Sequence, residues 1–454
     1  MDFNVKEFGA KGDGVTLDTA AIQAAVQAAA DAVAKAETEE DGDVKGAQRG
    51  AVTVRVLVPA GTYLTSSIFL GSNMEFHLEE GAVLLGTTEE ARYPVMRTRV
   101  AGIEMDWPVA ILNINGQENV RVSGKGTIDG QGPYWWKKYW GEDKTGGMRR
   151  EYDAAGLRWC VDYDCRRVRN LIVMESRNVE LSDFESIRSG FWNVHICYSE
   201  DVHVEGLYIH DNDGPSTDGI DIDSCSRVTV EHCRVACNDD SICIKSGRDA
   251  DGLRVNRICR DVVIQDCEIL TGCGVTIGSE TSGGAKNIIV RNLKYHNTDC
   301  GFRMKSARTR GGLIEDVLVE NLEMVNVKYP FNMCLNWHPA YSYCEIPAGY
   351  AGEVPQHWRT LLQPVEPERG IPQVRNITVR NVVSENEADY TGTSRAFEID
   401  AFPEKPMTNV VFENVKIHAK ELGRIQGVKG WSWNGVEISI DGPNDERNDQ
   451  YDVR

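Results

Sequence analysis

A short unit that recurs along most of the chain constrains the fold most strongly. It reads Asn/Asp-Val/Ile-x-Val/Ile-x-Asn/Gly/Asp/His, and neighbouring copies are mostly 26 to 34 residues apart. Clear copies begin at Asn119, Asp201, Arg227, Asp261, Asn287, Asp316, Asn376 and Asn409. Apolar residues alternating with polar ones are typical of a strand with one buried face, and such a period indicates a solenoid. The sequence therefore predicts an all-β fold, a single parallel β-helix whose coils stack about 4.8 Å apart.

Four segments between residues 214 and 306 share a second pattern: a small or acidic turn, alternating residues and a closing serine. They are TDGIDIDS (217–224), DDSICIKS (239–246), GCGVTIGS (272–279) and DCGFRMKS (299–306). Aligned on the serine, they give a turn column (Asp218, Asp240, Cys273, Cys300), an outward strand column (Asp221, Cys243, Thr276, Arg303) and a third column (Asp223, Lys245, Gly278, Lys305). Because stacked coils place the members of a column side by side, we expect these residues to form one surface.

The predicted solenoid spans residues 1–440, with an N-terminal cap over about residues 1–50 and a polar tail at 441–454. Ala-rich spacing with Ile22 and Val26 predicts an amphipathic helix over 18–36, and Asp18 or Thr19 can cap it. Such a helix would cover the open end of the solenoid. The charged residues 37–50 predict a solvated loop.

Two long insertions interrupt the period. Residues 131–160 contain four of the ten tryptophans. The gap between the units that begin at Asp316 and Asn376 is about twice the usual one and is rich in proline and aromatic residues. Insertions of a solenoid leave from one face and often build the wall of its binding site.

Charge and cysteine content exclude several classes of protein. The net charge of -20 argues against nucleic acid and anionic membrane surfaces as partners. No apolar run is long enough for a transmembrane helix, and residues 1–30 show no signal peptide. The sequence as written predicts a cytoplasmic protein, or a periplasmic or secreted one if a leader was removed. Thirteen cysteines without a zinc-type spacing predict buried small residues in a reduced protein, with no metal and no cofactor.

Five aspartates lie within about two coils of the column set: Asp218, Asp221, Asp223, Asp239 and Asp240. Aspartate also caps coil corners by accepting backbone N–H groups, and that structural role suits isolated residues. The Asp239–Asp240 pair with Asp218 one coil below brings like charges about 5 Å apart, which raises at least one pKa. A protonated carboxyl beside an ionised one is the pair that glycoside hydrolysis requires.

Basic residues occupy the same columns. Arg303 and Lys305 alternate on one strand, and Lys245 shares the column of Lys305. Basic residues on a strand are most often solvated, but these lie close to the carboxylates in an acidic protein. We therefore expect them to bind an anionic sugar, whose carboxylate Arg303 can hold bidentately.

The ordered set of motifs resembles the polygalacturonases, the pectin-cleaving glycoside hydrolases of family 28. The similar segments are residues 8–27, 59–87 and 124–136, FWNVHI at 191–196, STDGIDIDS at 216–224, NDDSICIKSGRD at 238–249, GCGVTIGSE at 272–280 and RMK at 303–305. Together they cover roughly residues 3–440. The resemblance implies a right-handed parallel β-helix and inverting hydrolysis of glycosidic bonds next to galacturonic acid.

The resemblance also implies roles for single residues. Asp239 would be the general acid, and Asp218 and Asp240 would position and deprotonate the attacking water. The substrate-binding candidates are Arg303, Lys305, Lys245, Cys273 and Tyr329, the last of which aligns with a substrate-binding tyrosine of the family. We also expect at least one aromatic residue of the insertions to contact a sugar, although these residues could simply pack the loops onto the coils.

Two positions depart from the family pattern. Ser216 replaces the asparagine of Asn-Thr-Asp-Gly, and Cys273 replaces the histidine of Gly-His-Gly. Cysteine is a weak hydrogen-bonding group and supplies no imidazole, so its presence points to a variant substrate such as a rhamnogalacturonan or a modified galacturonide. Aromatic insertions that could close one end of the cleft, and the lack of a signal peptide, favour exo action on oligosaccharides. The alternatives are a pectate lyase on the same fold and a non-catalytic carbohydrate-binding or adhesin β-helix, and the sequence predicts no oligomeric state.

Overall fold

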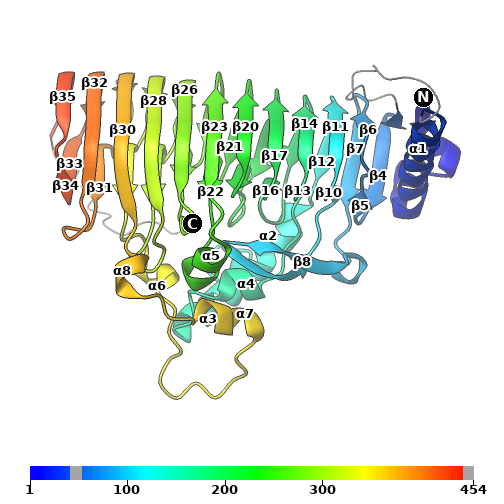
Figure 1. The fold of residues 1–454 in the computed structure, drawn as a ribbon, viewed down its shortest axis with the longest axis horizontal. Coiled ribbons are helices and arrows are strands. Elements are labelled where there is room, and N and C mark those ends of the chain that lie inside the picture. Colours follow the sequence, from blue (N-terminus) through cyan, green and yellow to red (C-terminus); the bar gives the residue numbers. More distant parts are fainter. Residues whose placement is uncertain (41–53, 443–454) are drawn as a thin grey trace.

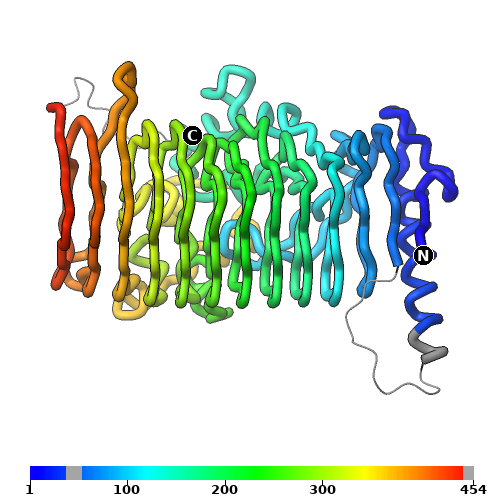
Figure 2. The backbone as a smooth tube through the Cα atoms, turned by 90° about the horizontal axis from the view of Figure 1, so that it is seen from above, coloured from blue at the N-terminus to red at the C-terminus, as the bar shows by residue number. Residues whose placement is uncertain are grey.

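Parallel strands form most of the molecule and wind into a right-handed β-helix (Figures 1 and 2). This computed structural model describes residues 1–40 and 54–442. The coils follow one another in chain order along the long axis, so each coil contacts mainly the coil before it and the coil after it (Figure 2). The all-β solenoid predicted from the recurring unit is thereby confirmed.

One sheet of 11 strands forms the face that carries the predicted columns. Its strands are β5 (Ile68–Phe69), β10 (Leu112–Asn115), β13 (Leu171–Met174), β16 (Val194–Cys197), β19 (Ile220–Asp223), β22 (Ile242–Lys245), β25 (Val275–Ile277), β27 (Cys300–Lys305), β29 (Tyr329–Cys334), β31 (Arg395–Asp400) and β33 (Glu421–Gln426). We call it the cleft sheet. Its inward Val, Ile, Phe and Met side chains join the continuous core.

A second sheet of 22 strands forms the remaining sides of each coil. Its strands are β1 (Asp2–Asn4), β2 (Asp13–Leu17), β3 (Arg55–Val58), β4 (Gly61–Thr65), β6 (Met74–Leu78), β7 (Ala82–Gly86), β11 (Glu118–Gly124), β12 (Thr127–Asp129), β14 (Arg177–Ser182), β15 (Glu185–Ile187), β17 (Glu200–Glu205), β18 (Tyr208–Asn212), β20 (Ser226–Glu231), β21 (Arg234–Cys237), β23 (Cys259–Gln265), β24 (Glu268–Thr271), β26 (Ala285–His296), β28 (Leu313–Val325), β30 (Gln373–Glu385), β32 (Met407–Ala419), β34 (Val428–Lys429) and β35 (Ser432–Ile440). The recurring sequence units lie in this sheet.

The polar ends of the recurring unit form two ladders along the β-helix. Both ends of the unit adopt positive φ, a conformation in which asparagine, aspartate and glycine are favoured. Asparagine amides then bond from coil to coil: Asn409 Nδ2 donates to Asn376 Oδ1 at 2.8 Å in one ladder, and Asn381 Nδ2 donates to Asn321 Oδ1 at 3.1 Å in the other. The ladders explain why Asn and Asp recur at these two places in the sequence.

Helix α1 (Thr19–Glu40) covers the N-terminal end of the β-helix, as predicted (Figure 1). Its residues Ile22 and Val26 are buried in the core. Asp18 stands just before the helix, and its backbone carbonyl accepts the N–H of Ile22. Its carboxylate accepts the backbone N–H groups of Lys11 and Gly12, and Thr19 Oγ1 accepts the N–H of Ser66, so both predicted side chains form bonds outside the first turn. The helix also continues to Glu40, beyond its predicted end at residue 36. The rest of the predicted 37–50 loop and most of the 441–454 tail lie outside the described residues.

The insertions gather on one side of the β-helix, beside the cleft sheet (Figure 1). The first predicted insertion contains α2 (Gly132–Trp140) and α3 (Gly147–Ala154), and α4 (Val161–Asp164) follows just beyond its predicted end at residue 160. The second contains α6 (Pro339–Ser342), α7 (Gln356–Leu361) and α8 (Pro367–Gly370). Two further insertions were not predicted: the antiparallel hairpin of β8 (Val95–Val100) and β9 (Ile103–Pro108), and helix α5 (Asp249–Val255). Short 3₁₀ turns lie at Val5–Phe8 and Glu90–Arg92.

A second apolar cluster holds these insertions together. Trp107 of the hairpin, Trp159 of the first insertion and Trp358 of the second pack in one cluster with Phe191 and Trp192 of the β-helix. Segments far apart in the sequence are thereby fixed against the cleft sheet.

The cysteines follow the prediction from their spacing. All thirteen are free; eleven are buried, and Cys273 and Cys344 are half-buried. Among the described residues, none of the helices combines the length and the apolar character that crossing a lipid bilayer requires.

Candidate active site

A cavity of about 100 Å³ lies over the cleft sheet, between the sheet and the insertions. It is lined by Ala101, Tyr139, Arg158, Asp162, Phe191, Trp192, Ser216, Asp218, Asn238, Asp239, Asp240, Lys245, Cys273, Ser279, Glu280, Asp299, Arg303, Lys305, Trp337 and Tyr341. All three predicted catalytic aspartates are among them. The strand register explains why, because Asp221, Cys243, Thr276 and Arg303 are direct partners on neighbouring strands, as predicted from their shared column.

The carboxylate of Asp240 lies at the centre of the charged groups. Lys305 Nζ lies 2.7 Å from Asp240 Oδ2 and Arg303 Nη1 lies 3.4 Å from Oδ1. Thr276 Oγ1 also donates to Oδ1, at 2.8 Å. Burial alone would raise the pKa of this carboxyl, but the charges of Lys305, Arg303 and Lys245 outweigh it and hold the pKa below its usual range. Asp240 is therefore the ionised member of the group.

The neighbouring carboxyl of Asp239 has the opposite tendency. It is half-buried, and its Oδ1 accepts the backbone N–H of Asp240 at 3.0 Å. Burial, followed by the negative charge of Asp240, raises the pKa of Asp239. The pKa values of two consecutive carboxyls are thus shifted in opposite directions. One of them can act as a proton donor while the other stays charged in the same cavity.

Asp218 lies one coil below Asp240, where the backbone N–H of Gly219 donates to Asp240 O at 2.9 Å. Burial and the nearby charges of Asp221 and Asp239 raise its pKa well above the usual value. The ammonium of Lys245 lies 3.4 Å from Asp218 Oδ2 and limits this effect. Asp218 can therefore accept a proton from a neighbouring group more readily than an ordinary aspartate.

Lys245, predicted to bind substrate, is enclosed by acidic groups. Its Nζ lies 3.3 to 3.9 Å from carboxylate oxygens of Asp218, Asp221, Asp240 and Glu280. The side chain is 4% exposed, and its ammonium lies 4.8 Å from the ring centre of Trp192. Its evident role in the structure is to balance the charge of the carboxylates.

Lys245 also lines the cavity, as do three of the other predicted substrate-binding residues. Arg303, Lys305 and Cys273 line the cavity. Tyr329 does not line it: its register partner is Cys300, and it shares the strand alternation of the inward residues Phe331 and Met333.

Aromatic residues of the insertions form the cavity walls, which is the arrangement expected for contact with a sugar. Trp337 and Tyr341 of the second insertion pack with ring centres 5.6 Å apart, and Trp337 also lies 4.6 Å from Lys305 Nζ. Tyr139 comes from α2 of the first insertion. Trp192 completes the wall from the β-helix itself.

Sequence reasoning missed several lining residues, including Glu280, Arg158, Asp162 and Trp192. Glu280 follows the closing serine of the third segment by one position, and this adjacency was the only signal that could have indicated it. Burial opposes its ionisation, but Lys245 and Arg310 lower its pKa. Arg158 and Asp162 belong to an insertion without a repeating pattern, so no column could place them.

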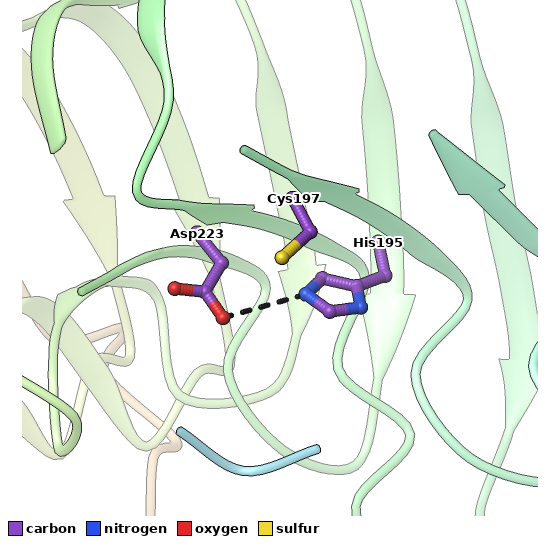
Figure 3. Close-up of side chains that lie close together, drawn as sticks. All are labelled: His195, Cys197 and Asp223. Carbon is purple, nitrogen blue, oxygen red and sulfur yellow. Dashed lines mark ion pairs between the residues drawn. The ribbon is translucent and has the colours of Figure 1, made fainter. Parts of the chain in front are cut away.

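On the outward face of β16 and β19, His195, Cys197 and Asp223 form a buried group that the sequence did not indicate (Figure 3). Their ligand-type atoms lie within 4.8 Å of one another, with His195 Nε2 3.5 Å from Asp223 Oδ2. Arg99 Nη1 already lies 2.9 Å from Asp223 Oδ1, and burial together with the charge of Arg169 lowers the pKa of His195 to about 4. The guanidinium charges make this group unfavourable for a metal cation.

The His195 group instead supports the cavity floor. The imidazole of His195 lies edge-on to Trp192 with ring centres 4.8 Å apart. Trp192 in turn packs against the ammonium of Lys245. The group therefore fixes an aromatic side chain that the cavity requires.

Comparison with known proteins agrees with this geometry. The sequence model of glycosyl hydrolases family 28 matches residues 50–347, and that of rhamnogalacturonase A/epimerase, pectate lyase-like, matches residues 3–90. A probable polygalacturonase of Vitis vinifera is 28% identical over 424 residues, which cover 91% of this chain and 73% of the relative. An exo-poly-alpha-D-galacturonosidase of Dickeya chrysanthemi is 24% identical over 476 residues, covering 96% and 70%.

The fold has a close counterpart among solved structures. A hyperthermoactive exopolygalacturonase from Thermotoga maritima superposes with a TM-score of 0.72 at 24% identity, covering 97% of this chain and 92% of the other. The cleft of this β-helix holds two neighbouring carboxyls whose pKa values are shifted in opposite directions. This geometry and the family and sequence matches together identify the protein as a glycoside hydrolase. The chain belongs to glycosyl hydrolase family 28 and is similar to the polygalacturonases.

Proposed function

We propose that this protein hydrolyses the bond next to a terminal galacturonic acid in pectic oligosaccharides, with inversion at the anomeric carbon. The observation that carries the proposal is the pair of consecutive carboxyls in one cavity, with the pKa of Asp239 raised and that of Asp240 lowered. Galacturonides as substrates are supported by the names of the relatives and by the cations in the cavity, which suit an anionic sugar.

In this proposal Asp239 is the general acid. Its proton passes to the glycosidic oxygen as the bond from that oxygen to the anomeric carbon breaks. A water molecule attacks the anomeric carbon from the opposite face, and Asp218 and Asp240 orient the water and take up its proton. Arg303 and Lys305 hold Asp240 ionised in the free protein, and they are also close enough to the carboxylates to bind the carboxylate of the sugar.

The turn of the β8–β9 hairpin, which lines the cavity, supports exo action. Ala101 at the turn of the β8–β9 hairpin lines the cavity, and the backbone N–H of Arg248 donates to Gly102 O at 2.8 Å. A Cβ on Gly102 would lie 2.5 Å from Glu280 Cγ and 2.7 Å from Arg248 N, so the turn packs too tightly for a side chain. The positive φ of 86° at Gly102 also favours glycine. A rigid hairpin turn at this position favours binding of a chain end over binding of an internal segment.

Products of oligogalacturonides test the proposal. Mass spectrometry of a trigalacturonate digest should show galacturonate and digalacturonate, and NMR of the first product should show the inverted anomer. A lyase would instead produce unsaturated sugars that absorb in the near ultraviolet, and a binding protein would produce nothing.

The role of Asp239 is tested by Asp239→Asn, which should lower kcat by about 10²- to 10⁴-fold. The matched control is Asp213→Asn, because Asp213 is an exposed aspartate in the segment just before Asp218 and does not line the cavity. Full turnover by Asp239→Asn would show that the acid has been assigned to the wrong residue.

A further inference from the structure

The apolar core of the β-helix is open at its C-terminal end. Helix α1 covers the first coil, whereas among the described residues no helix or strand lies beyond β33, β34 and β35 of the last coil (Figures 1 and 2). Five large apolar side chains of this coil are 36 to 51% exposed: Leu422, Ile425, Trp433, Ile438 and Ile440. We call these five residues the terminal apolar group.

Four members of the terminal apolar group continue columns that are buried in the preceding coil. The register pairs them with residues of the core: Trp433 with Phe412, Ile438 with Ile417, Ile440 with Ala419, and Ile425 with Ile399. The same inward positions are thus buried in one coil and exposed in the next. The cause is that, in the described part of the chain, no further coil stacks on them.

The ring of Trp433 marks the place where the core ends. It stacks on Phe412 with ring centres 4.7 Å apart and planes 9° apart, and Phe412 packs in turn against Phe397 of the cleft sheet. Trp433 is nevertheless 40% exposed. A tryptophan held by apolar packing on one side and open on another is the kind of residue that dominates protein–protein contacts.

The last coil also presents backbone groups. Strand β35 extends over nine residues and pairs with β32, and no described strand pairs with its other edge. A long apolar strand edge that is not covered readily pairs with a strand of another chain. The end of the β-helix therefore combines an apolar surface with a row of hydrogen-bonding groups.

The charge of the last coil does not oppose contact with a like surface. Residues 420–441 carry three basic and three acidic side chains, whereas the whole chain has a net charge of -20. Repulsion between two copies of this acidic protein is therefore weak at this end. Residues 443–454, PNDERNDQYDVR, lie outside the described part and include only Tyr451 and Val453 as large apolar residues. Their composition favours a different cover for five large apolar side chains.

We propose that the C-terminal end of the β-helix binds the same end of a second copy of this chain, which gives an end-to-end dimer with two-fold symmetry. A two-fold axis can bring β35 beside its counterpart in the antiparallel direction and bury the two terminal apolar groups against each other. Because α1 covers the N-terminal end, an open end can meet only another open end, so the assembly stops at two copies. The inference does not rest on the proposed function.

The contact lies apart from the active-site cavity. Strand β27, which carries Arg303 and Lys305, is three strands from β33 in the cleft sheet, or about 14 Å along the axis. No member of the terminal apolar group lines the cavity. Loss of the contact should therefore leave the turnover of a substrate unchanged.

Analytical ultracentrifugation of the full chain tests the proposal. Over about a 100-fold range of concentration, the unaltered protein should reach twice the chain mass of 50.5 kDa. The double variant Ile438→Lys/Ile440→Lys places charges in the contact and should keep the mass of one chain. The matched control is Val95→Lys/Val383→Lys, at two valines that are exposed to a similar extent elsewhere, and it should form the dimer. A single-chain mass for the unaltered protein, or a dimer of the Ile438→Lys/Ile440→Lys protein, would overturn the inference.

Cross-linking of the unaltered protein locates the contact without any substitution. In a mixture of unlabelled and ¹⁵N-labelled chains, an amine-reactive reagent should join Lys420 or Lys429 of one copy to the same residues of the other, since both lie in the last coil. Lys6 and Lys11, near the opposite end, should form no links between copies. Links between copies that involve only other regions would overturn the inference.

The alternative cover is the chain's own residues 443–454. Deletion of these residues should leave the mass of the dimer unchanged. A dimer that appears only after the deletion would show that residues 443–454 cover the end within one chain, and the inference would then fail.

Discussion

Replacing Asp221 by asparagine should stabilise the protein, and increasingly so as the pH rises. Asp221 lies on the outward face of β19 and is fully buried, and Lys245 Nζ lies 3.4 Å from its Oδ1. Burial, with the charges of Asp240 and Glu280, raises its pKa to about 8, against the opposing charge of Lys245. The ordinary value for an unfolded chain is about 3.9.

The sign and size follow from the difference in bound protons. Between pH 4 and 8 the folded protein holds a proton on Asp221 that the unfolded chain has released, so the free energy of unfolding falls as the pH rises. Each pH unit contributes about 1.4 kcal/mol, which amounts to about 4 kcal/mol at pH 7 as an upper bound. Asparagine resembles the protonated carboxyl and does not titrate. The gain from Asp221→Asn should therefore be near zero at pH 4 and level off above pH 8.

Urea unfolding of both proteins at several pH values between 4 and 8.5 measures this difference. The control is Asp223→Asn, two residues along the same strand, where Arg99 and His195 hold the pKa down despite burial. That variant should be destabilised at neutral pH, because it leaves the buried guanidinium of Arg99 without its carboxylate. A gain for Asp221→Asn that does not change with pH would refute the reasoning.

Three other expectations concern separate parts of the molecule. Lys305→Met removes the ammonium nearest to Asp240, which should raise the pKa of that carboxyl. The acidic limb of the pH dependence of kcat/KM should then move to higher pH by about one to three units. An unchanged limb would contradict the assigned contact. Burial raises the pKa of the Cys273 thiol well above its ordinary value. Its alkylation by iodoacetamide, measured by mass spectrometry, should therefore be slow at about pH 7 and should still accelerate above about pH 9. A rate that levels off below about pH 8 would contradict the raised pKa. Asn381→Ala breaks two ladder hydrogen bonds at a residue with φ of 54°, and it should lower the free energy of unfolding in urea by about 1 to 3 kcal/mol. Asn381→Gly should lower it less, because glycine adopts this φ freely. Equal losses would show that the backbone conformation contributes nothing.

The columns could be predicted from the sequence because a β-helix converts spacing along the chain into position in space. Once Ser224, Ser246, Ser279 and Ser306 are aligned, each outward residue has one neighbour on the next strand, and the register agrees at Asp221, Cys243, Thr276 and Arg303. The charge environment was harder to predict. That Lys245 binds substrate stays a prediction, and the sequence did not indicate that four carboxylates surround it, one of them on Glu280 beyond the end of a segment.

The cavity walls could not be predicted in the same way. Arg158 and Trp337 reach the cavity because the insertions fold against one another through Trp107, Trp159 and Trp358, and no period relates these segments. The sequence showed that the insertions were aromatic, but not which side chains would line the site. The β8–β9 hairpin, whose turn lines the cavity through Ala101, contains no unusual composition that would have marked it.

The stacking of the coils also sets a scale of distance for the active site. Groups in one column can be separated along the axis only by whole multiples of the strand spacing of about 4.8 Å. Asp218 and Asp240 are one step apart, and Arg303 is two steps beyond Asp240. A side chain or a loop can change without altering these intervals, but changing the axial distance between the backbones of these residues would require removing or adding a complete coil. The axial layout of the site can therefore vary only in discrete steps, each as large as one turn of the solenoid.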